Sequence, residues 1–461
     1  MAKRINDLGR DPVGPLLLRL AIPSVTAQLV NALYNIVDRM YIGHIENEGA
    51  LALTGLGVTF PVLMIISALS ALVCVGGGSQ AAIRMGEGNQ ERANEILGNC
   101  ACLLLIFSVL VTGFFQLFKE PLLLLFGASE NTIGYASDYL SIYLWGTVFV
   151  QCSVGLNFFI SNQGFSTVSM RTVLLGAATN IVLDPIFIFG FHMGVRGAAL
   201  ATVIAQGVSA AWVLRFLTGP KTKLRIQKRY FRLRRQVLAP VLALGLSPFI
   251  MNATESALNI AFNSSLKRYG GDMAVCAMTI SASIVQVMST LFAGVSQGAQ
   301  PIVSYNYGAG QSDRCRQVFR LLFTISLTLS TAFWLALRLV PGVFIAIFND
   351  DPALVDYAVW AVQIYAAGLF IMGVQFSCQN AFVALGQAKI SLFLALLRKC
   401  ILLIPLIFIL PRFFADQVFA VFLAEPVADI LAGLTTGTLF FLRFPRILAA
   451  REKELAEKRP A

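Results

Sequence analysis

The residues from Leu16 to Ile42 constrain the fold of this chain more than any other stretch. They read LLLRLAIPSVTAQLVNALYNIVDRMYI, and no charged residue occurs between Arg19 and Asp38. About 20 mostly apolar residues are enough to cross a bilayer, so this stretch predicts a transmembrane helix. A proline in a helix removes a backbone donor and clashes with the preceding turn, so we predict that the helix bends at Pro23.

The polar side chains of this helix fall on a single face. Successive members are three, four and three positions apart, and they are Gln28, Asn31, Asn35 and Asp38. At helical periodicity this spacing makes one narrow stripe, which we expect to face protein or a water-filled cavity. The residues predicted to line a substrate cavity are Gln28, Asn31, Tyr34 and Asn35.

The carboxylate of Asp38 is the feature of this face with the strongest functional implication. An acid inside a span is energetically expensive, which makes Asp38 a candidate functional residue. The alternative interpretation is a structural ion pair with the neighbouring Arg39 or with Arg171.

The composition places the whole chain in the bilayer. Of its 461 residues 57% are hydrophobic and 13% are charged, and the mean hydropathy is +0.74. These values are typical of a polytopic membrane protein. The net charge of +11 resides in loops between apolar stretches, so it does not indicate nucleic-acid binding. Two histidines and eight scattered cysteines offer no spacing for a metal site, a disulfide framework or a catalytic triad, so we expect no cofactor and no enzyme activity.

Apolar stretches recur twelve times, six on each side of a basic linker. They lie near residues 16–42, 49–83, 96–118, two within 139–189, 194–217, 238–266, 273–305, 321–348, 355–384, 391–410 and 418–442. We therefore predict an all-α protein with twelve transmembrane helices in two pseudo-symmetric six-helix lobes around a central cavity. The predicted divisions are an N-lobe at 1–218, a linker at 219–236, a C-lobe at 237–446 and a tail at 447–461.

The two halves share local sequence. LRLAIPSVTAQLVNALYNIVD resembles LALGLSPFIMNATESALNIAFN, which aligns Pro23 with Pro248, and MGEGNQERANEI resembles YGAGQSDRCRQV. Two six-helix units put their first helices on the same side of the membrane, as parallel repeats, and transporters built in this way bind substrate at the repeat interface. The paired glycines in the second match are turn residues rather than a nucleotide site, because neither follows a strand.

Charged loops predict the orientation. The linker 219–236 holds eight Lys or Arg and no acid, and short basic loops stay cytoplasmic, so we predict cytoplasmic N- and C-termini in the inner membrane of a cell. The other predicted inner residues are Lys3, Arg4, Arg10, Arg84, Arg92, Arg314, Arg316 and Arg320. The predicted outer residues are Glu46, Glu48, Glu120, Glu130, Asp350, Asp351 and Asp356. Lys267, Arg268 and Arg412 are exceptions to this pattern.

A second intramembrane acid occurs in TNIVLDPIFIF. Asp184 lies one turn after Asn180, and Pro185 predicts a kink that frees backbone carbonyls. Thr202 lies on a polar face of the next helix. Together with Asp38, these oxygens would suit H⁺ or a hard cation such as Na⁺. The alternative for Asp184 is that an Asp-Pro pair only kinks the helix.

The second half has its own polar helix face. Its members are Asn252, Glu255, Ser256, Asn259 and Asn263. We predict that Glu255, Asn259 and Gln375 contribute to an ion or substrate site in the C-lobe. An internal ion pair of Glu255 with Arg398 or Lys399 is an equally weighted alternative, and Glu425 and Asp429 are further possible partners of these bases.

These motifs resemble the multidrug and toxin extrusion (MATE) family of transporters, in its prokaryotic form. The resemblance rests on GGGSQAAIRMGEGNQERANEI, LDPIFIFGFHMGVRGAALATVIAQ and SQGAQPIVSYNYGAG, and it extends over essentially the whole chain. It implies two lobes around a V-shaped cavity and export of organic, often cationic, compounds in exchange for H⁺ or Na⁺. The family's N-lobe ion site matches at Asp38, Asn180, Asp184 and Thr202. Its C-lobe acids match only at Glu255, because the tenth helix offers Gln375, Gln379 and Asn380 instead.

The sequence therefore predicts a monomeric antiporter that confers multidrug efflux and antibiotic resistance. Three alternatives compete with this interpretation. A lipid-linked oligosaccharide flippase of a related fold would have more helices and a basic cavity. A membrane-embedded enzyme would need a nucleophile, base or metal constellation. A structural scaffold would not need acids on its polar stripes.

Overall fold

The structure is a computed structural model that describes residues 6–46, 48–348 and 352–457. Within these ranges every regular element is helical and no strand occurs. Lys3, Arg4, Asp350 and Asp351, which entered the orientation prediction, lie outside the described residues, as do the last four residues of the predicted tail.

The N-lobe contains the elements up to residue 218. They are α1 (Val13–Gly43), α2 (Gly49–Gly86), α3 (Gln90–Leu125), α4 (Ile133–Trp145), α5 (Thr147–Val150), the π-helix η1 (Gln151–Gly155), α6 (Leu156–Asn162), α7 (Ser166–Pro185), the π-helix η2 (Ile186–Gly190) and α8 (Gly194–Thr218). The linker that follows contains one 3₁₀ turn, η3 (Lys228–Tyr230).

The C-lobe contains the remaining elements. They are α9 (Arg235–Gly308), α10 (Ser312–Leu339), α11 (Pro341–Ile345), α12 (Pro352–Tyr365), η4 (Ala366–Gly368), α13 (Leu369–Ala384), α14 (Ala388–Leu396), the π-helix η5 (Leu397–Leu403), α15 (Ile404–Ile409), η6 (Leu410–Arg412) and α16 (Gln417–Glu457).

The described residues provide twelve membrane crossings, as predicted. Ten helices, some continued by a short π- or 3₁₀ turn, are long and apolar enough to span a bilayer. An eleventh crossing is the pair Ile133–Trp145 and Thr147–Asn162, which bends by 58° at the break between its two helices. The twelfth comes from α9, which turns back at Gly271, where a φ of 66° and a ψ of −161° interrupt the helix. Only glycine adopts such a conformation at no steric cost.

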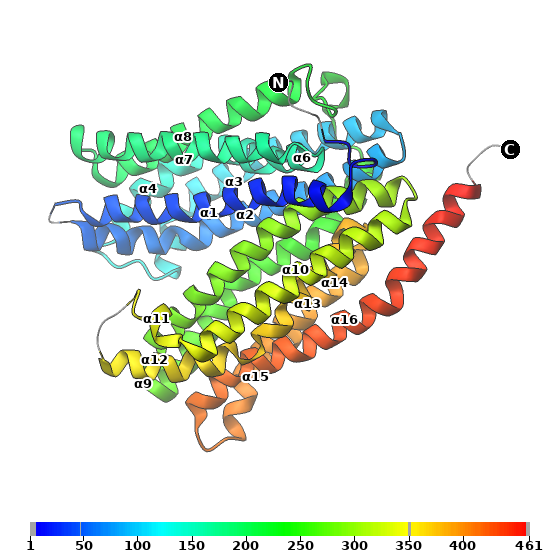
Figure 1. Ribbon diagram of the computed structural model, residues 1–461. Coiled ribbons are helices and arrows are strands. Elements are labelled where there is room, and N and C mark those ends of the chain that lie inside the picture. The colour runs from blue at the N-terminus through cyan, green and yellow to red at the C-terminus, as the bar shows by residue number, and fades with distance from the viewer. Residues whose placement is uncertain (1–5, 47, 349–351, 458–461) are drawn as a thin grey trace.

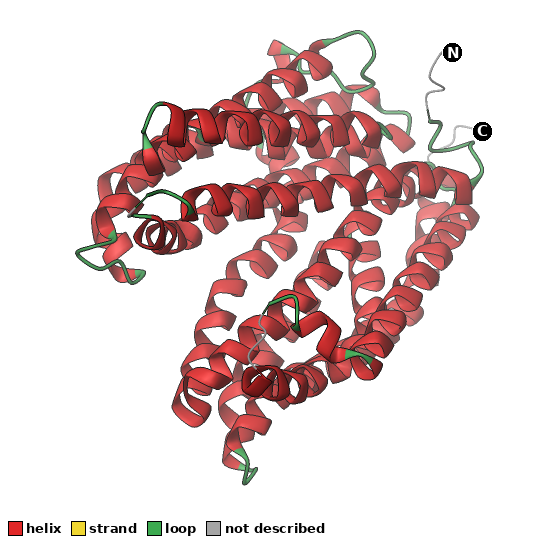
Figure 2. Ribbon diagram, turned by 60° about the vertical axis from the view of Figure 1, so that its left-hand side comes forward, coloured by secondary structure: helices red, strands yellow, loops and turns green. Residues whose placement is uncertain are grey.

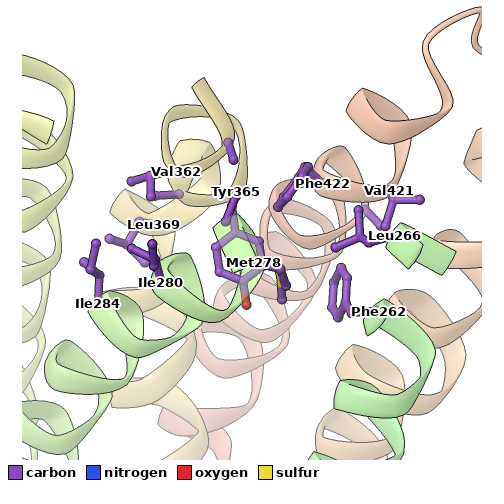
Figure 3. Packing of buried hydrophobic residues seen from close by; sticks show 14 of the residues in the cluster. Phe262, Leu266, Met278, Ile280, Ile284, Val362, Tyr365, Leu369, Val421 and Phe422 are labelled. Atoms are coloured by element: carbon purple, nitrogen blue, oxygen red, sulfur yellow. The ribbon is translucent and has the colours of Figure 1, made fainter. Parts of the chain in front are cut away.

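The twelve crossings form two groups that meet at one end of the molecule. Figures 1 and 2 show the N-lobe and C-lobe helices close together at the end that carries both termini, and diverging toward the other end. Among the residues that the structure describes, each lobe has one apolar core of its own, and two further cores contain residues of both halves. In the C-lobe, Phe262, Met278, Tyr365 and Phe422 pack together from α9, α12 and α16 (Figure 3).

The end that carries the termini is closed by polar contacts across the lobes. Arg314 of α10 donates to the carbonyls of Leu8 and Asp11 at 3.1 and 2.8 Å. Arg451, in the part of α16 that the sequence predicted as a separate tail, pairs with Glu87 at the end of α2. The long α16 thus ties the last described turns of the chain to the N-lobe.

Glycines allow the helices of the two lobes to pack closely against each other, and we call this contact between the lobes the seam. A Cβ added at Gly76 would lie 2.1 Å from the carbonyl oxygen of Val241, and one added at Gly245 would lie 1.7 Å from that of Leu72. The duplicated motifs meet in the same way, because a Cβ at Gly86 would lie 1.9 Å from the oxygen of Tyr305 and one at Gly308 would lie 2.0 Å from that of Ile83. The two halves therefore contact each other closely at glycines, and Gly86 and Gly308 occupy matching places in the two motifs.

Replacing Gly245 with alanine is expected to destabilise the protein by about 1–3 kcal/mol, the usual range for overpacking, since the methyl group collides with a backbone carbonyl. The matched control is Gly57→Ala in α2, where an added Cβ meets nothing within 4 Å. Alanine favours helix over glycine, so the control should unfold at the wild-type temperature or above it. Thermal unfolding of the two purified variants in detergent measures the difference, and equal midpoints would contradict the seam described here.

Candidate functional site

Two carboxylates from different helices meet inside the N-lobe. Asp38 lies near the end of α1 and Asp184 at the end of α7, and both side chains are buried. Helix α1 packs along α7, and the two carboxyl groups lie close enough to interact with each other. A hydrogen bond between two carboxyl groups requires a proton on one of them, because ionised carboxylates only accept. One proton taken up by the pair would therefore allow the two carboxyl groups to hydrogen-bond.

Asn180 and Thr202 complete the cluster, as the helical faces predicted. The Asn180 amide Nδ2 donates to Asp184 Oδ1 at 3.1 Å and to Thr202 Oγ1 at 3.4 Å. The first of these bonds spans one turn of α7, and the second reaches across to α8. All four predicted residues of the N-lobe ion site are thus brought together.

Several oxygens of this cluster have no hydrogen-bond donor from the described residues. They are Asp38 Oδ1, Asp184 Oδ2 and Asn180 Oδ1, and all three are buried. Buried acceptors without a partner are energetically unfavourable, and they are normally satisfied by a proton, a water or a cation. The carboxylates can take up a proton, and the carboxylate and amide oxygens together can coordinate a hard cation, so the residues present fit H⁺ or Na⁺. Among the described residues no group of three or more His, Cys, Asp or Glu is placed to hold a metal ion.

Two tyrosines border the acid pair, and sequence reasoning assigned only one of them. Tyr34 of α1 lies close enough to interact electrostatically with Asp38 and Asp184. Tyr139 of α4 lies close enough to interact with Thr202 and Asp38, and its ring stacks on that of Tyr143 with 6.0 Å between the ring centroids. Tyr139 was missed because it lies at the beginning of a predicted span, where tyrosine is common as an interfacial residue. Its one-turn spacing from Tyr143 was the available signal.

The helix carrying Asp184 becomes irregular directly after it. α7 ends at Pro185, and the next five residues form the π-helix η2. Proline cannot donate to the preceding turn, and π-helical turns are frequent at functional sites. The irregularity predicted beside Asp184 is therefore present. By contrast, α1 passes through Pro23 as one uninterrupted helix, so bending at Pro23 stays a prediction.

Neither arginine considered as a structural partner forms an ion pair with Asp38 in the described part of the chain. The Arg39 guanidinium lies over the ring of Phe60 at 5.9 Å, although it is near enough to act on Asp38 through space. Arg171 is exposed. The acid that Asp38 contacts is Asp184, which makes a purely structural ion pair the poorer explanation of its burial.

A cavity of about 210 Å³ lies between the lobes, and its wall is rich in amides. The side chains that line it include Gln28 and Phe158 from the N-lobe, and Met251, Asn252, Gln297, Gln300, Gln375, Phe376, Gln379, Asn380 and Arg398 from the C-lobe. Gln28 joins the lobes directly by donating to Gln297 at 3.3 Å. The Oε1 atom of Gln375 is buried without a partner, so it is free to accept from a ligand.

The other predicted cavity residues lie outside this cavity. Asn31 and Asn35 are exposed further along α1, where Asn35 donates to the Asn31 carbonyl at 2.6 Å. Tyr34 turns toward the acid pair instead. Of the predicted C-lobe residues, Gln375 lines the cavity, whereas Asn259 is exposed on α9 beyond it.

The ionisable residues of the C-lobe form two adjoining ion-pair groups. Arg398 of η5 lies between two buried acids of α16, with Nη2 3.0 Å from Glu425 and 2.8 Å from Asp429. Lys399 pairs with Glu255 of α9 and also donates to the Met251 carbonyl at 2.8 Å. The internal pairing that the sequence left open as an alternative for Glu255 is therefore observed.

Known proteins match this chain along its whole length. A family model described as MatE matches residues 23–186 and 248–409, once in each half. The multidrug export protein MepA of Staphylococcus haemolyticus is 24% identical over 419 residues, which cover 90% of this chain and 91% of that protein. The MepA of Staphylococcus aureus strain N315 is 24% identical, with 92% and 94% covered.

Solved structures of MATE proteins also match nearly the full length of this chain. The MATE multidrug transporter DinF-BH is 34% identical with a TM-score of 0.86, covering 96% of this chain and 98% of that one. A MATE protein in the straight conformation superimposes with a TM-score of 0.89 at 23% identity, covering 97% and 99%, and it supports the fold. Two matches to the family model, one in each lobe, coincide with the duplicated architecture and with the acid cluster between α1 and α7. The chain belongs to the MATE family of transporters.

Proposed function

We propose that this protein is a secondary active efflux antiporter that exports organic, often cationic, compounds in exchange for H⁺ or Na⁺. The observation that carries the proposal is the proximity of Asp38 and Asp184, two buried acids on neighbouring helices, which supports uptake of a coupling ion at this pair. The export activity is supported by the relatives that are multidrug export proteins. We further propose that the protein acts as a monomer in the cell membrane, with both termini in the cytoplasm.

In the proposed cycle, a drug occupies the cavity between the lobes while the acid pair lacks its ion. An ion arriving from outside neutralises the excess charge of Asp38 and Asp184, and α1 then bends at Pro23 and narrows the N-lobe side of the cavity. The ion gradient supplies enough energy to drive export of a drug against its own gradient. One pH unit supplies about 1.4 kcal/mol, and one charge crossing 100 mV supplies about 2.3 kcal/mol.

The lipid-linked oligosaccharide flippase is not favoured. Its large, charged headgroup would need a basic cavity, whereas the single charged residue among those lining the described cavity is Arg398, which is already neutralised by two acids.

Dye efflux from proteoliposomes tests the proposal. With a fluorescent cationic dye and an imposed pH gradient or an imposed Na⁺ gradient, we expect uphill dye movement under one gradient, and its loss when an ionophore collapses that gradient. The effective gradient identifies the coupling ion. Dye movement that is indifferent to both gradients would refute the antiport.

A further inference from the structure

The two bases of η5 are adjacent in sequence, but the acids with which they pair differ in how exposed they are. Arg398 pairs with Glu425 and Asp429, whose side chains are 10% and 4% exposed. Lys399 pairs with Glu255, and here the base is 7% exposed while the acid is 52% exposed. Glu255 is therefore the one acid of the three that an incoming molecule can contact.

Glu255 lies on the helix face that forms the cavity wall. Met251 and Asn252 line the cavity, and Glu255 follows them by one turn of α9. Residues three and four positions apart share a helix face, so the Glu255 carboxylate lies just beyond the amide-rich cavity on the same side. A cation bound in the cavity or leaving it would meet this carboxylate.

The repeat shows what is unusual about this pair. The first and fifth crossings of the N-lobe bring an acid of α1 against an acid of α7, which is followed by the π-helix η2. The corresponding seventh and eleventh crossings bring an acid of α9 against Lys399, which lies within the π-helix η5. In the proposed function the N-lobe acids bind a cation from solution, whereas Glu255 in the C-lobe is already paired with a cationic side chain, that of Lys399.

We propose that Lys399 is a tethered competitor for cationic substrates at Glu255, a specificity-determining role that rests on the proposed transport function. An organic cation pairs with Glu255 only by displacing the Lys399 ammonium, which keeps the Met251 carbonyl as its second partner. The lysine thereby lowers the affinity for cations and favours their release. A lysine suits this role because its ammonium is a point charge on a flexible stem, unlike the fixed fork of arginine.

Equilibrium binding of tetraphenylphosphonium to the purified full-length protein tests the role of Lys399. This ion carries a permanent charge, and tetraphenylborate is a matched probe of the same shape with the opposite charge. In Lys399→Met the cation should bind about five- to tenfold more tightly than in wild type, as expected for removing a competing charge from a partly exposed pair. Tetraphenylborate should bind no more tightly. Lys399→Arg keeps the positive charge, so it should not bind the cation more tightly than wild type does. Glu255→Gln combined with Lys399→Met should lose the gain.

The outcomes separate this inference from the transport function. Equal cation affinity in wild type and Lys399→Met, with gradient-driven dye efflux intact, overturns the tethered competitor and leaves the antiporter standing. A parallel gain for both probes also overturns it, because that result reports a loosened cavity rather than a freed carboxylate. Failure of every variant to bind the cation, together with absent efflux, overturns both. Lys399→Gln replaces the methionine variant if the latter does not fold.

Discussion

Asp38→Asn is expected to reduce gradient-driven dye efflux to the level of protein-free vesicles. The amide cannot take up a proton at neutral pH, so Asp184 loses the neighbouring acid with which we propose that it binds the ion. The N-lobe site then keeps only one of its two acids, and we expect that the roughly 1.4 kcal/mol that each pH unit supplies is no longer coupled to export. Efflux from proteoliposomes under an imposed gradient measures the loss.

Two further measurements separate lost coupling from lost folding. The substitution preserves shape and removes a buried charge, so the thermal midpoint of Asp38→Asn should equal or exceed that of wild type. Asp272→Asn is the matched control, since this acid is 90% exposed in the turn of α9 and lies 3.9 Å from Lys267. It should transport normally. Full efflux by Asp38→Asn would refute the role assigned to the acid pair.

Arg398→Met is expected to reduce the free energy of unfolding by about 3–5 kcal/mol, the range found when one partner of a buried ion pair is removed. The guanidinium donates from Nε to Asp429 and from Nη2 to Glu425, and without it these two buried acids lie one helical turn apart with no cation between them. Thermal unfolding in detergent should show a large decrease in midpoint and a reduced folded yield.

The control for this prediction is Arg196→Met. Arg196 forms a two-bonded pair with Asp138 at 2.9 and 3.0 Å, but both side chains are exposed, so its loss should change the free energy of unfolding by about 0–1 kcal/mol. Adding Glu425→Gln and Asp429→Asn to Arg398→Met should recover much of the stability, because the uncompensated charges are then gone. Equal midpoints for the two arginine variants would show that the C-lobe group is not a buried ion-pair network.

The local sequence pattern was sufficient to predict the membrane-spanning helices of this fold. Runs of apolar residues between charged loops located the crossings, and the repeated sequence around Pro23 and Pro248 showed that the chain is duplicated. The polar residues of α1 are spaced by three and four positions, which placed Asp38 on a polar face. Pro185 predicted the irregular helix beside Asp184. These features depend on near neighbours in the chain, so the sequence can show them directly.

Pairing between distant helices required the tertiary structure. Periodicity says which side of a helix is polar, but not which other helix it faces, so the contact of Tyr139 with Thr202 could not be read from spacing. Arg398 pairs with an acid of α16, whereas the adjacent Lys399 pairs with an acid of α9. These different directions depend on the π-helical turn in which both bases lie. The membrane-spanning helices and the candidate acids could therefore be predicted from the order of the residues. Only the packed lobes decided that Asp38 meets an acid and Glu255 a base, because burial forces each charge to find its partner among whatever helices enclose it.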